Sequence, residues 1–341
     1  MEREHMDVRS SMDADVVIVG GGAVGLHAAY KCALLNMKVL VLDKGRKWCR
    51  GYHVPKFHNI PMHPEGISGK DLIGALRKSC AQREDLITII DFTEVEDVER
   101  SVTADGPVFN TKAVSAKTDA ESSYRSRAVI LCTGVVDRQP DIKGSFRTIL
   151  PYANKALAMY CPICDGHLLK GKSIGVLGHT GPARSILAAL RMFQPGSLTL
   201  LTNGKELMEG TDAPAEKVAG WKRSLSDHEV SVLKGTITEL FGVDRDVFGV
   251  VLDDGTRKEF DHVFVALGWY SMNTGLGTAL GGTVDDEGFL RTDEDCRVLD
   301  GKGTPIIGLY AVGDVRNTWN QVPIGWGDAE KAVIDIRFEV L

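Results

Sequence analysis

Residues 16–25 read Val-Val-Ile-Val-Gly-Gly-Gly-Ala-Val-Gly, and the architecture of the chain follows from this stretch. Four apolar residues predict a buried strand, and the glycines after it form the pattern G-x-G-x-x-G. In this pattern Gly20 makes the tight turn, Gly22 leaves room for a pyrophosphate, and Gly25 lets helix and strand pack closely. The stretch therefore predicts a strand, a phosphate-binding turn and a helix that runs through Leu35.

The residues that follow complete a mononucleotide-binding unit. Residues 39–42, Val-Leu-Val-Leu, predict a second buried strand that ends at Asp43. Asp43 comes about 20 residues after the glycines, where an acidic side chain binds a ribose hydroxyl in folds of this kind. A glycine turn in an empty α/β domain is the alternative, but strand, turn, helix, strand and acid all occur here in the required order.

Residues 161–166 read Cys-Pro-Ile-Cys-Asp-Gly and indicate redox chemistry. Two cysteines separated by two residues can close a small disulfide, and one thiol can help to ionise the other. Only a thiolate attacks a disulfide, so a proton must move as the dithiol forms, and Asp165 is the candidate acid/base. Half of a zinc site or two ordinary buried cysteines are the alternatives, but no second C-x-x-C accompanies Cys161 and Cys164.

The composition is typical of a soluble globular chain with two domains. The chain has 341 residues, of which 43% are hydrophobic and 25% charged, and this length exceeds one ordinary domain. The net charge of -6 argues against nucleic-acid binding and favours small-molecule or protein partners. The seven scattered cysteines indicate a reducing cytoplasmic location, and no apolar run is long enough to span a membrane. The charged residues 1–12 lack the apolar core of a signal peptide, so we expect a flexible tail.

A second mononucleotide-type unit follows the cysteines. Residues 173–177 predict a strand that leads into residues 178–183, Gly-His-Thr-Gly-Pro-Ala, and then into a helix. The helix runs to Met192 and is followed by a strand at residues 198–202. Further segments with a strand and then a turn are residues 128–134, 262–268 and 309–314. The sequence thus predicts an α/β fold with two Rossmann-like, three-layer domains, one nested within the other.

Together these motifs resemble the low-molecular-weight thioredoxin reductase family of flavoproteins, from about Asp13 to the C-terminus. The resemblance implies a discontinuous FAD-binding domain of residues 13–138 and 268–341. It also implies an inserted central domain of residues 139–267 that carries the cysteine pair and a nicotinamide-type site. Members form homodimers and rotate the central domain, so hinges are expected near residues 136–144 and 266–273.

The resemblance also implies roles for particular residues. Cys164 faces the flavin, Cys161 attacks the substrate, and Asp165 moves the proton. Asn320-Gln321 stand where the family has Arg-Gln beside the isoalloxazine ring. The residues expected to bind FAD belong to the glycine turns, their neighbours and the late Gly-Asp pair: Gly20, Gly22, Ala23, Gly25, Asp43, Lys44, Thr133, Gly134, Gly313, Asp314, Gln321 and Val322.

The nicotinamide-type site departs from the family pattern. Thr180 replaces the middle glycine, and a side chain there obstructs the close approach of a pyrophosphate. Residues 201–206, Leu-Thr-Asn-Gly-Lys-Glu, replace the arginines that clamp the 2′-phosphate of NADPH, and one lysine cannot reproduce a bidentate clamp.

The expected function is therefore a disulfide oxidoreductase whose electron donor is not NADPH. The partner would be a thioredoxin-like protein or a small disulfide, and the donor could be ferredoxin. A second flavin or NAD(P)H at the central site is also consistent with the pattern. The alternatives are an ordinary NADPH-dependent thioredoxin reductase and an oxygen-using dithiol oxidase.

Aromatic residues and histidines near these motifs have two explanations each. Trp269 and Trp326 could stack on a planar ring or pack in a core or dimer contact. His53, His58 and His63 recur at regular spacing, but no acid or cysteine completes a ligand set, so no metal site is predicted.

Overall fold

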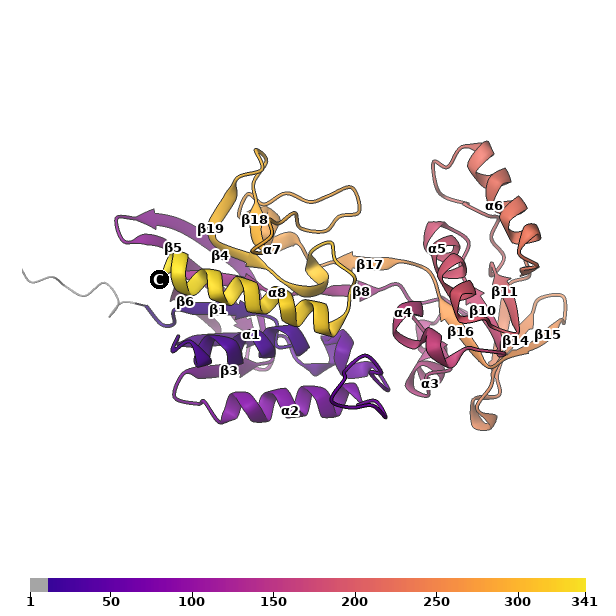
Figure 1. Ribbon diagram of the computed structural model, residues 1–341, viewed down its shortest axis with the longest axis horizontal. Helices are drawn as coiled ribbons and strands as arrows, with labels where there is room; N and C mark the ends of the chain where they lie inside the picture. Colours follow the sequence, from indigo (N-terminus) through magenta and orange to yellow (C-terminus); the bar gives the residue numbers. More distant parts are fainter. Residues whose placement is uncertain (1–11) are drawn as a thin grey trace, which may run out of the picture. The chain divides into compact units, whose positions relative to one another are not determined.

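The computed structural model describes residues 12–341, so the flexible tail expected for residues 1–12 lies outside the described residues apart from Met12. The chain divides into two compact units (Figure 1). Among the described residues, unit 1 comprises residues 12–53, 67–136 and 272–341, and unit 2 comprises residues 54–66 and 137–271. Both units are mixed α/β structures with a parallel sheet, so the predicted fold class is confirmed.

Unit 1 is built on a six-stranded sheet. In spatial order its strands are β18 (Arg297–Leu299), β19 (Pro305–Ala311), β7 (Ala128–Leu131), β1 (Val16–Val19), β2 (Val39–Asp43) and β3 (Ile87–Asp91). All neighbours pair in parallel except β18, which runs antiparallel to β19. Strands β1, β2 and β7 are apolar and buried at almost every position, as expected for parallel strands that are covered on both faces.

Two further layers cover this sheet. Helices α1 (Ala23–Leu34), α2 (Gly69–Ala81) and α8 (Val322–Asp335) lie on one face, and Figure 1 shows α1 and α8 side by side. An antiparallel sheet of β4 (Thr93–Thr103), β5 (Gly106–Ser115) and β6 (Glu121–Ser126) covers the other face. Alternate residues of β1 divide between the two layers: Ile18 packs with the helices, and Val17 packs toward the second sheet. The short helix α7 spans Gly275–Ala279.

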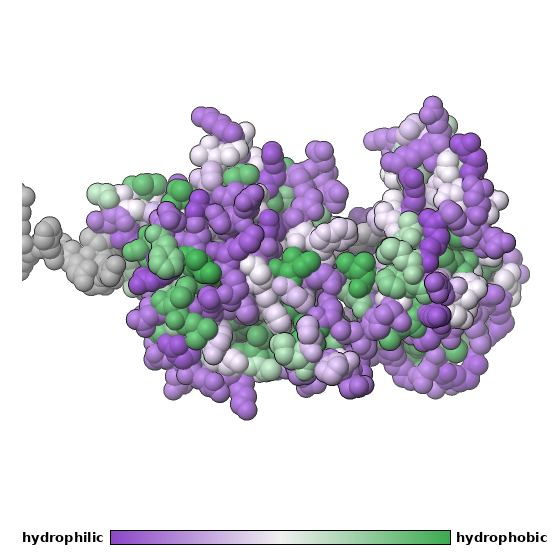
Figure 2. Space-filling model, in the orientation of Figure 1, coloured by the Kyte–Doolittle hydropathy of each residue, from purple (hydrophilic) through white to green (hydrophobic). Residues whose placement is uncertain are grey.

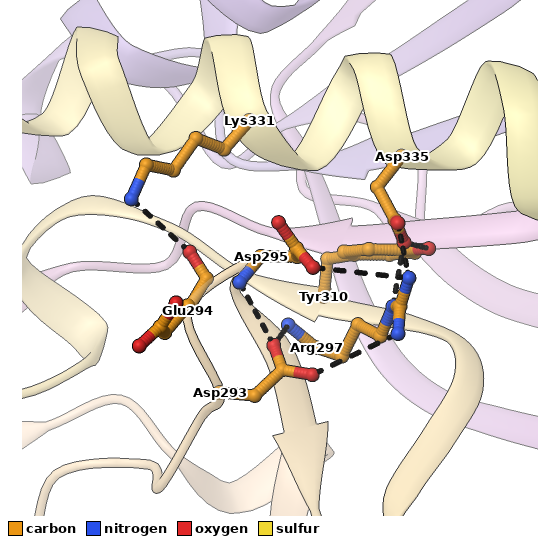
Figure 3. Close-up of polar contacts among 7 residues, drawn as sticks. All are labelled: Asp293, Glu294, Asp295, Arg297, Tyr310, Lys331 and Asp335. Atoms are coloured by element: carbon orange, nitrogen blue, oxygen red, sulfur yellow. Dashed lines mark hydrogen bonds and ion pairs between the residues drawn. The ribbon is translucent and has the colours of Figure 1, made fainter.

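A charged network fastens α8 to the edge of the sheet (Figure 3). Asp335, near the end of α8, accepts hydrogen bonds from the Arg297 guanidinium on β18 and from the Tyr310 hydroxyl on β19, the latter at 2.6 Å. Asp293 and Asp295 lie 3.9 Å from the same guanidinium. Because Asp335 is buried, the two donors compensate the cost of removing its charge from water.

Unit 2 repeats the three-layer plan on a five-stranded parallel sheet. Its strands in spatial order are β12 (Ser231–Leu233), β11 (Ser197–Leu201), β10 (Ser173–Leu177), β16 (His262–Val265) and β9 (Ala158–Met159). Helices α5 (Gly181–Leu190) and α6 (Ala215–Asp227) pack on one face. The antiparallel strands β13 (Ile237–Phe241), β14 (Phe248–Leu252) and β15 (Arg257–Phe260) pack on the other with α3 (Leu150–Asn154). Within residues 12–341 no helix has the length and apolar character needed to cross a membrane.

Two short strands connect the units. Strands β8 (Val135–Asp137) and β17 (Trp269–Met272) pair with each other as a two-stranded sheet. The unit boundaries fall inside these strands, between residues 136 and 137 and between residues 271 and 272. Residues 54–66 are separated from the rest of unit 2 in the sequence, yet they group with it.

Candidate active site

The glycine turn of unit 1 is held by close backbone approaches. A Cβ on Gly25 would lie 1.9 Å from the Gly20 carbonyl oxygen, and a Cβ on Gly20 would lie 2.5 Å from the carbonyl oxygen of Cys132. Gly20 also has a φ of +108°, which side chains rarely allow. By contrast, a Cβ on Gly22 would meet just the Cys49 sulfur at 3.6 Å, so the space in front of this residue is open. The turn is thus rigid on the sheet side and open at the start of α1.

Other predicted residues converge on the same end of the sheet. Asp43 is buried at the end of β2, where it accepts the Gly21 N–H at 3.2 Å. A Cβ on Gly313 would lie 3.2 Å from Val24 in the first turn of α1. In the next turn, the Thr133 hydroxyl donates to the Asn273 carbonyl oxygen at 2.7 Å. The carboxyl ends of parallel strands meet in this way at the ligand-binding edge of such folds.

Sequence reasoning missed several charged groups that hold these residues. Arg50 donates to the Asp314 carboxylate at 3.0 Å, and both side chains are about a quarter exposed. Asp328 on α8 accepts from Arg316 at 2.7 Å and from the Gly313 N–H at 3.4 Å. Arg50 could have been found from the sequence, because it ends a basic run that starts at Lys44. The pairing of Arg316 with Asp328 could not, because it depends on how α8 packs.

Asp43 and Lys44 have partners of their own in unit 1. Arg77 on α2 donates to Asp43 at 3.1 Å and to Asp91 at 2.6 Å, so one guanidinium joins the ends of β2 and β3. Lys44 pairs with Glu94 on β4. The Asp43 carboxylate is therefore fixed at the strand end.

The residues of unit 1 fit an FAD cofactor. The first turn of α1 contains no acidic residue and no side-chain cap, so its N–H groups can bind a pyrophosphate at the open side of Gly22. The side-chain nitrogen of Asn320 is buried and has no hydrogen-bond partner within the described part of the chain, which suits the carbonyl oxygen of a bound ring. The neighbouring residues Gln321 and Val322 begin α8.

The two candidate redox cysteines form a disulfide in unit 2. Cys161 and Cys164 are bonded, with their Cα atoms 5.3 Å apart. Cys161 is the N-cap of the short helix α4 (Pro162–Asp165), and the Cys164 N–H donates to its carbonyl oxygen at 3.2 Å. Burial raises the pKa of Asp165 to about 6, so this carboxyl can hold a proton near neutral pH. Disulfide and proton donor therefore share one helical turn.

The glycine of the motif has a packing role. Gly166 is buried against the aromatic ring of Phe193, and a Cβ at this position would come within 2.2 Å of that ring. Phe193 follows α5 in the short 3₁₀ helix at Arg191–Phe193. The contact fixes the redox segment to α5.

The second glycine turn differs from the first. Gly178 and Ala183 lie in close contact, since a Cβ on Gly178 would be 3.0 Å from the Ala183 Cβ. Thr180 is the N-cap of α5 but makes no capping hydrogen bond with its side chain. The Met208 N–H donates to the His179 carbonyl oxygen at 2.7 Å, and Met208 is 6% exposed. The chain after β11 therefore folds back onto this turn.

The residues that replace the arginine clamp form an anchored loop. Asn203 accepts the Ile237 N–H at 2.7 Å, and a Cβ on Gly204 would meet the Thr236 hydroxyl at 2.5 Å. Lys205 pairs with Glu209 at 2.8 Å. The cation in this loop is thus already paired.

The remaining candidates from the sequence, an aromatic residue and the histidines, make contacts of other kinds. The Trp326 indole donates to the Ala23 carbonyl oxygen at 3.0 Å and stacks on His27, which is a packing contact between α8 and α1. His53 contacts the carbonyl oxygen of Lys47, and His58 contacts His167. No group of three metal-ligating side chains was found among residues 12–341.

Comparison with known proteins identifies the family. The chain is 25% identical to thioredoxin reductase of Listeria monocytogenes, over 92% of this chain and 90% of that protein. It is 27% identical to a component of alkyl hydroperoxide reductase from Xanthomonas campestris, over 98% of this chain but 58% of that protein. The crystal structure of HlmI, 28% identical, covers 94% of this chain and matches it with a TM-score of 0.77 over 91% of its own length. The thioredoxin reductase of Streptococcus pyogenes has the same fold, with a TM-score of 0.75, 22% identity and coverage of 95% of this chain and 96% of its own.

The family model for pyridine nucleotide-disulphide oxidoreductases matches residues 14–329. The matched range contains both glycine turns, the disulfide and the late Gly-Asp pair. The chain therefore belongs to the pyridine nucleotide-disulphide oxidoreductase family and is a flavin-dependent oxidoreductase.

Proposed function

We propose that this flavoprotein transfers two electrons through the Cys161–Cys164 disulfide to a thioredoxin-like protein or a small disulfide. The disulfide on α4, next to a carboxyl that holds a proton near neutral pH, is the observation that carries the proposal. Bound FAD would supply a two-electron store that exchanges electrons with this disulfide. The FAD-binding residues would be those of the glycine turns and strand ends of unit 1 predicted from the sequence.

The cysteines and Asp165 divide the chemistry. When the disulfide is reduced, one sulfur becomes a thiol and needs a proton, which the neutral Asp165 carboxyl can deliver. The resemblance assigns Cys161 to attack on the substrate disulfide, which forms a mixed disulfide and releases one substrate sulfur. Cys164 then attacks Cys161, restores the internal disulfide and releases the second substrate sulfur.

We infer that the electron donor is not NADPH. The Met208 N–H donates a hydrogen bond to the His179 carbonyl oxygen of the second glycine turn, and Lys205 is paired with Glu209. The loop after β11 thus lies against the turn, and it offers no arginine pair for the 2′-phosphate, which weighs against tight binding of NADPH. Plant-type ferredoxins lie near about −400 mV and thioredoxin-type dithiols near about −270 mV, so ferredoxin could drive the step.

A second candidate runs in the opposite direction. If the turn in unit 2 accepts no donor, electrons can enter through the disulfide itself. A small dithiol would reduce the Cys161–Cys164 pair, become a disulfide and pass two electrons through FAD to oxygen, which would form hydrogen peroxide. Contact of Met208 with His179 is the observation that favours this alternative.

We propose a homodimer in the cytoplasm. Ile334 and Phe338, near the C-terminal end of α8, are 43% and 77% exposed, and Figure 2 shows an apolar surface over that end. Burial of such a patch in a dimer is favourable. Sedimentation velocity should show a dimer that Phe338→Asp weakens, while Phe92→Asp, at an exposed residue near Lys117, should leave it intact.

An anaerobic titration tests the proposed donor. The FAD-loaded protein is mixed with NADPH, NADH, reduced ferredoxin or dithiothreitol, and flavin absorbance is followed. Ferredoxin or the dithiol should bleach the flavin, and both nicotinamides should do so slowly. Rapid bleaching by micromolar NADPH would return the protein to ordinary NADPH-dependent thioredoxin reductase chemistry. Hydrogen peroxide formed from oxygen and dithiol would support the oxidase alternative.

A further inference from the structure

Residues 54–66 bring a histidine to the redox segment of unit 2. The imidazole rings of His58 and His167 meet edge to face, with centroids 5.1 Å apart and an interplanar angle of 71°. Ile60, two residues after His58, is 1% exposed, which anchors the segment. His167 lies on the 3₁₀ turn Gly166–Leu168, which directly continues α4. The two imidazoles therefore meet about one helical turn after Cys164.

The charges around this pair favour a neutral His58. Desolvation lowers the pKa of His58, and the positive charges of His167 and Lys56 lower it further. A neutral imidazole can accept a hydrogen bond or a proton from its neighbour. His58 is half-buried and His167 is exposed, so a substrate could reach His167 directly.

The other titratable groups of the redox segment are less suited to the substrate side. Burial raises the pKa of Asp165. A substrate sulfur approaches from solvent, so this half-buried carboxyl is less accessible to it. The Tyr160 hydroxyl donates to Gln139 at 2.6 Å. Lys170 is exposed but lies beyond the turn that holds His167. His167 is thus the titratable side chain that is both exposed and next to α4.

We propose that His167, positioned by His58, moves the proton at the sulfur that meets the substrate, an inference that rests on the disulfide exchange proposed above. Asp165 would then serve the flavin-side sulfur. Through this pair of histidines, residues 54–66, which lie far from the cysteines in the sequence, take part in proton transfer at the cysteines.

The exchange step balances with these groups. His167 takes the proton of the Cys161 thiol, and the thiolate attacks one sulfur of the substrate disulfide. The substrate S–S bond breaks, and the leaving sulfur takes the proton back from the imidazolium. The Cys164 thiol then attacks Cys161, its proton goes to the second substrate sulfur, and the internal disulfide re-forms. The dithiol is oxidised by two electrons and the substrate disulfide is reduced by two; a dithiol substrate runs the same steps in reverse.

Alkylation of the reduced holoprotein tests the proton-transfer role. The protein is reduced with a phosphine and treated with iodoacetamide between pH 5 and 10, and the modification of Cys161 and Cys164 is followed by mass spectrometry. In His167→Gln, the rate at Cys161 should fall about three- to tenfold at pH 7, with a thiol titration closer to the ordinary value. The matched control is His63→Gln, which removes an exposed histidine of the same segment and should change nothing. An unchanged profile in both His167→Gln and His167→Asn would overturn the proposal.

A second readout tests the role of His58. Imidazole NMR titration should show the pKa of His58 rising in His167→Gln, because a positive neighbour is lost. His58→Gln should shift the pH midpoint of Cys161 alkylation upward, and an unchanged midpoint would remove His58 from the role. Both measurements need no electron donor and no protein partner. The two proposals can fail separately. If the wild-type protein reduces no substrate disulfide but the variants still shift the alkylation midpoint of Cys161, the proposed function is wrong and the coupling of the histidines to the thiol is supported.

Discussion

The backbone N–H of Met208 donates to the carbonyl oxygen of His179 at 2.7 Å, so the loop after β11 is hydrogen-bonded to the glycine turn in front of α5. In a nucleotide-binding unit this turn lies where the pyrophosphate would pass. The structure thus joins two departures that the sequence showed separately, Thr180 in the turn and the missing arginines in the loop.

The first prediction concerns nucleotide binding. NADPH and NADH should bind with similar, weak affinity, because no arginine pair is present to bind the 2′-phosphate. Each lost charge-assisted hydrogen bond removes about 1.5–3 kcal/mol, so affinity should be at least one to two decades below that of a clamped site. Calorimetric titration of the holoprotein measures both constants, and micromolar binding with strong preference for NADPH would contradict the prediction.

The second prediction concerns the disulfide. Cys161→Ser and Cys164→Ser should each abolish turnover, because no internal disulfide can form. Cys32→Ala should retain near-normal turnover, since burial raises the pKa of that thiol and leaves it unreactive. Turnover is measured with a thioredoxin-like protein or a small disulfide. Full activity of Cys161→Ser would show that the pair is structural.

The elements that could be predicted from the sequence are those that local patterns encode. The strand at Val16–Val19, the turn after it and the disulfide were all predicted, because each depends on residues a few positions apart. The antiparallel layer of β4, β5 and β6 was not predicted, since its half-exposed strands lack a strong apolar pattern and pair through tertiary contacts.

The contacts that define the site were harder to predict for the same reason. His58 meets His167 across more than a hundred residues of sequence, and the contact depends on residues 54–66 packing with unit 2. Pairing of Arg50 with Asp314 likewise depends on two turns that meet only in the folded unit. The spacing of residues along the chain carries no information on such pairs.

The third prediction concerns Asp165. Its raised pKa, about 6, means that folding favours the protonated carboxyl, so this contribution to stability is complete below pH 4 and is lost as pH rises through 6. Asp165→Asn should therefore be more stable than wild type at pH 8, by on the order of 1–3 kcal/mol. The same variant should transfer electrons between the flavin and the Cys161–Cys164 disulfide about 10²- to 10⁴-fold more slowly and lose the pH dependence near 6. Denaturant unfolding and stopped-flow rates measure the two effects, which should have opposite signs.

The fourth prediction concerns the contact of Gly166 with Phe193. Gly166→Ala should destabilise unit 2 by about 1–3 kcal/mol, because the ring must move to admit the methyl group. Gly220→Ala is the matched control: it lies within α6 with no atom near its Cβ position, so it should stabilise by about 0.5–1 kcal/mol. Equal stability of the two variants in denaturant unfolding would show that the ring yields freely.

The last prediction concerns Asp335, which holds α8 to the sheet. Burial alone would raise the pKa of this carboxyl, but hydrogen bonds from Arg297 and Tyr310 outweigh it and hold the pKa below the usual value. A lowered pKa stabilises the fold above the unfolded-state value, near 4, and this contribution is lost as the pH falls through the folded-state value. Asp335→Asn should therefore destabilise the fold by about 1–3 kcal/mol at pH 7, since the Arg297 guanidinium loses its hydrogen-bonded carboxylate and keeps Asp293 and Asp295 at 3.9 Å. This cost should shrink as the pH falls from 7 to 3. Tyr310→Phe removes one hydrogen bond and should cost about 1 kcal/mol at pH 7. Thermal unfolding of the three proteins across this pH range measures the difference, and an Asp335→Asn penalty that stays constant with pH would place the cost in packing instead of charge.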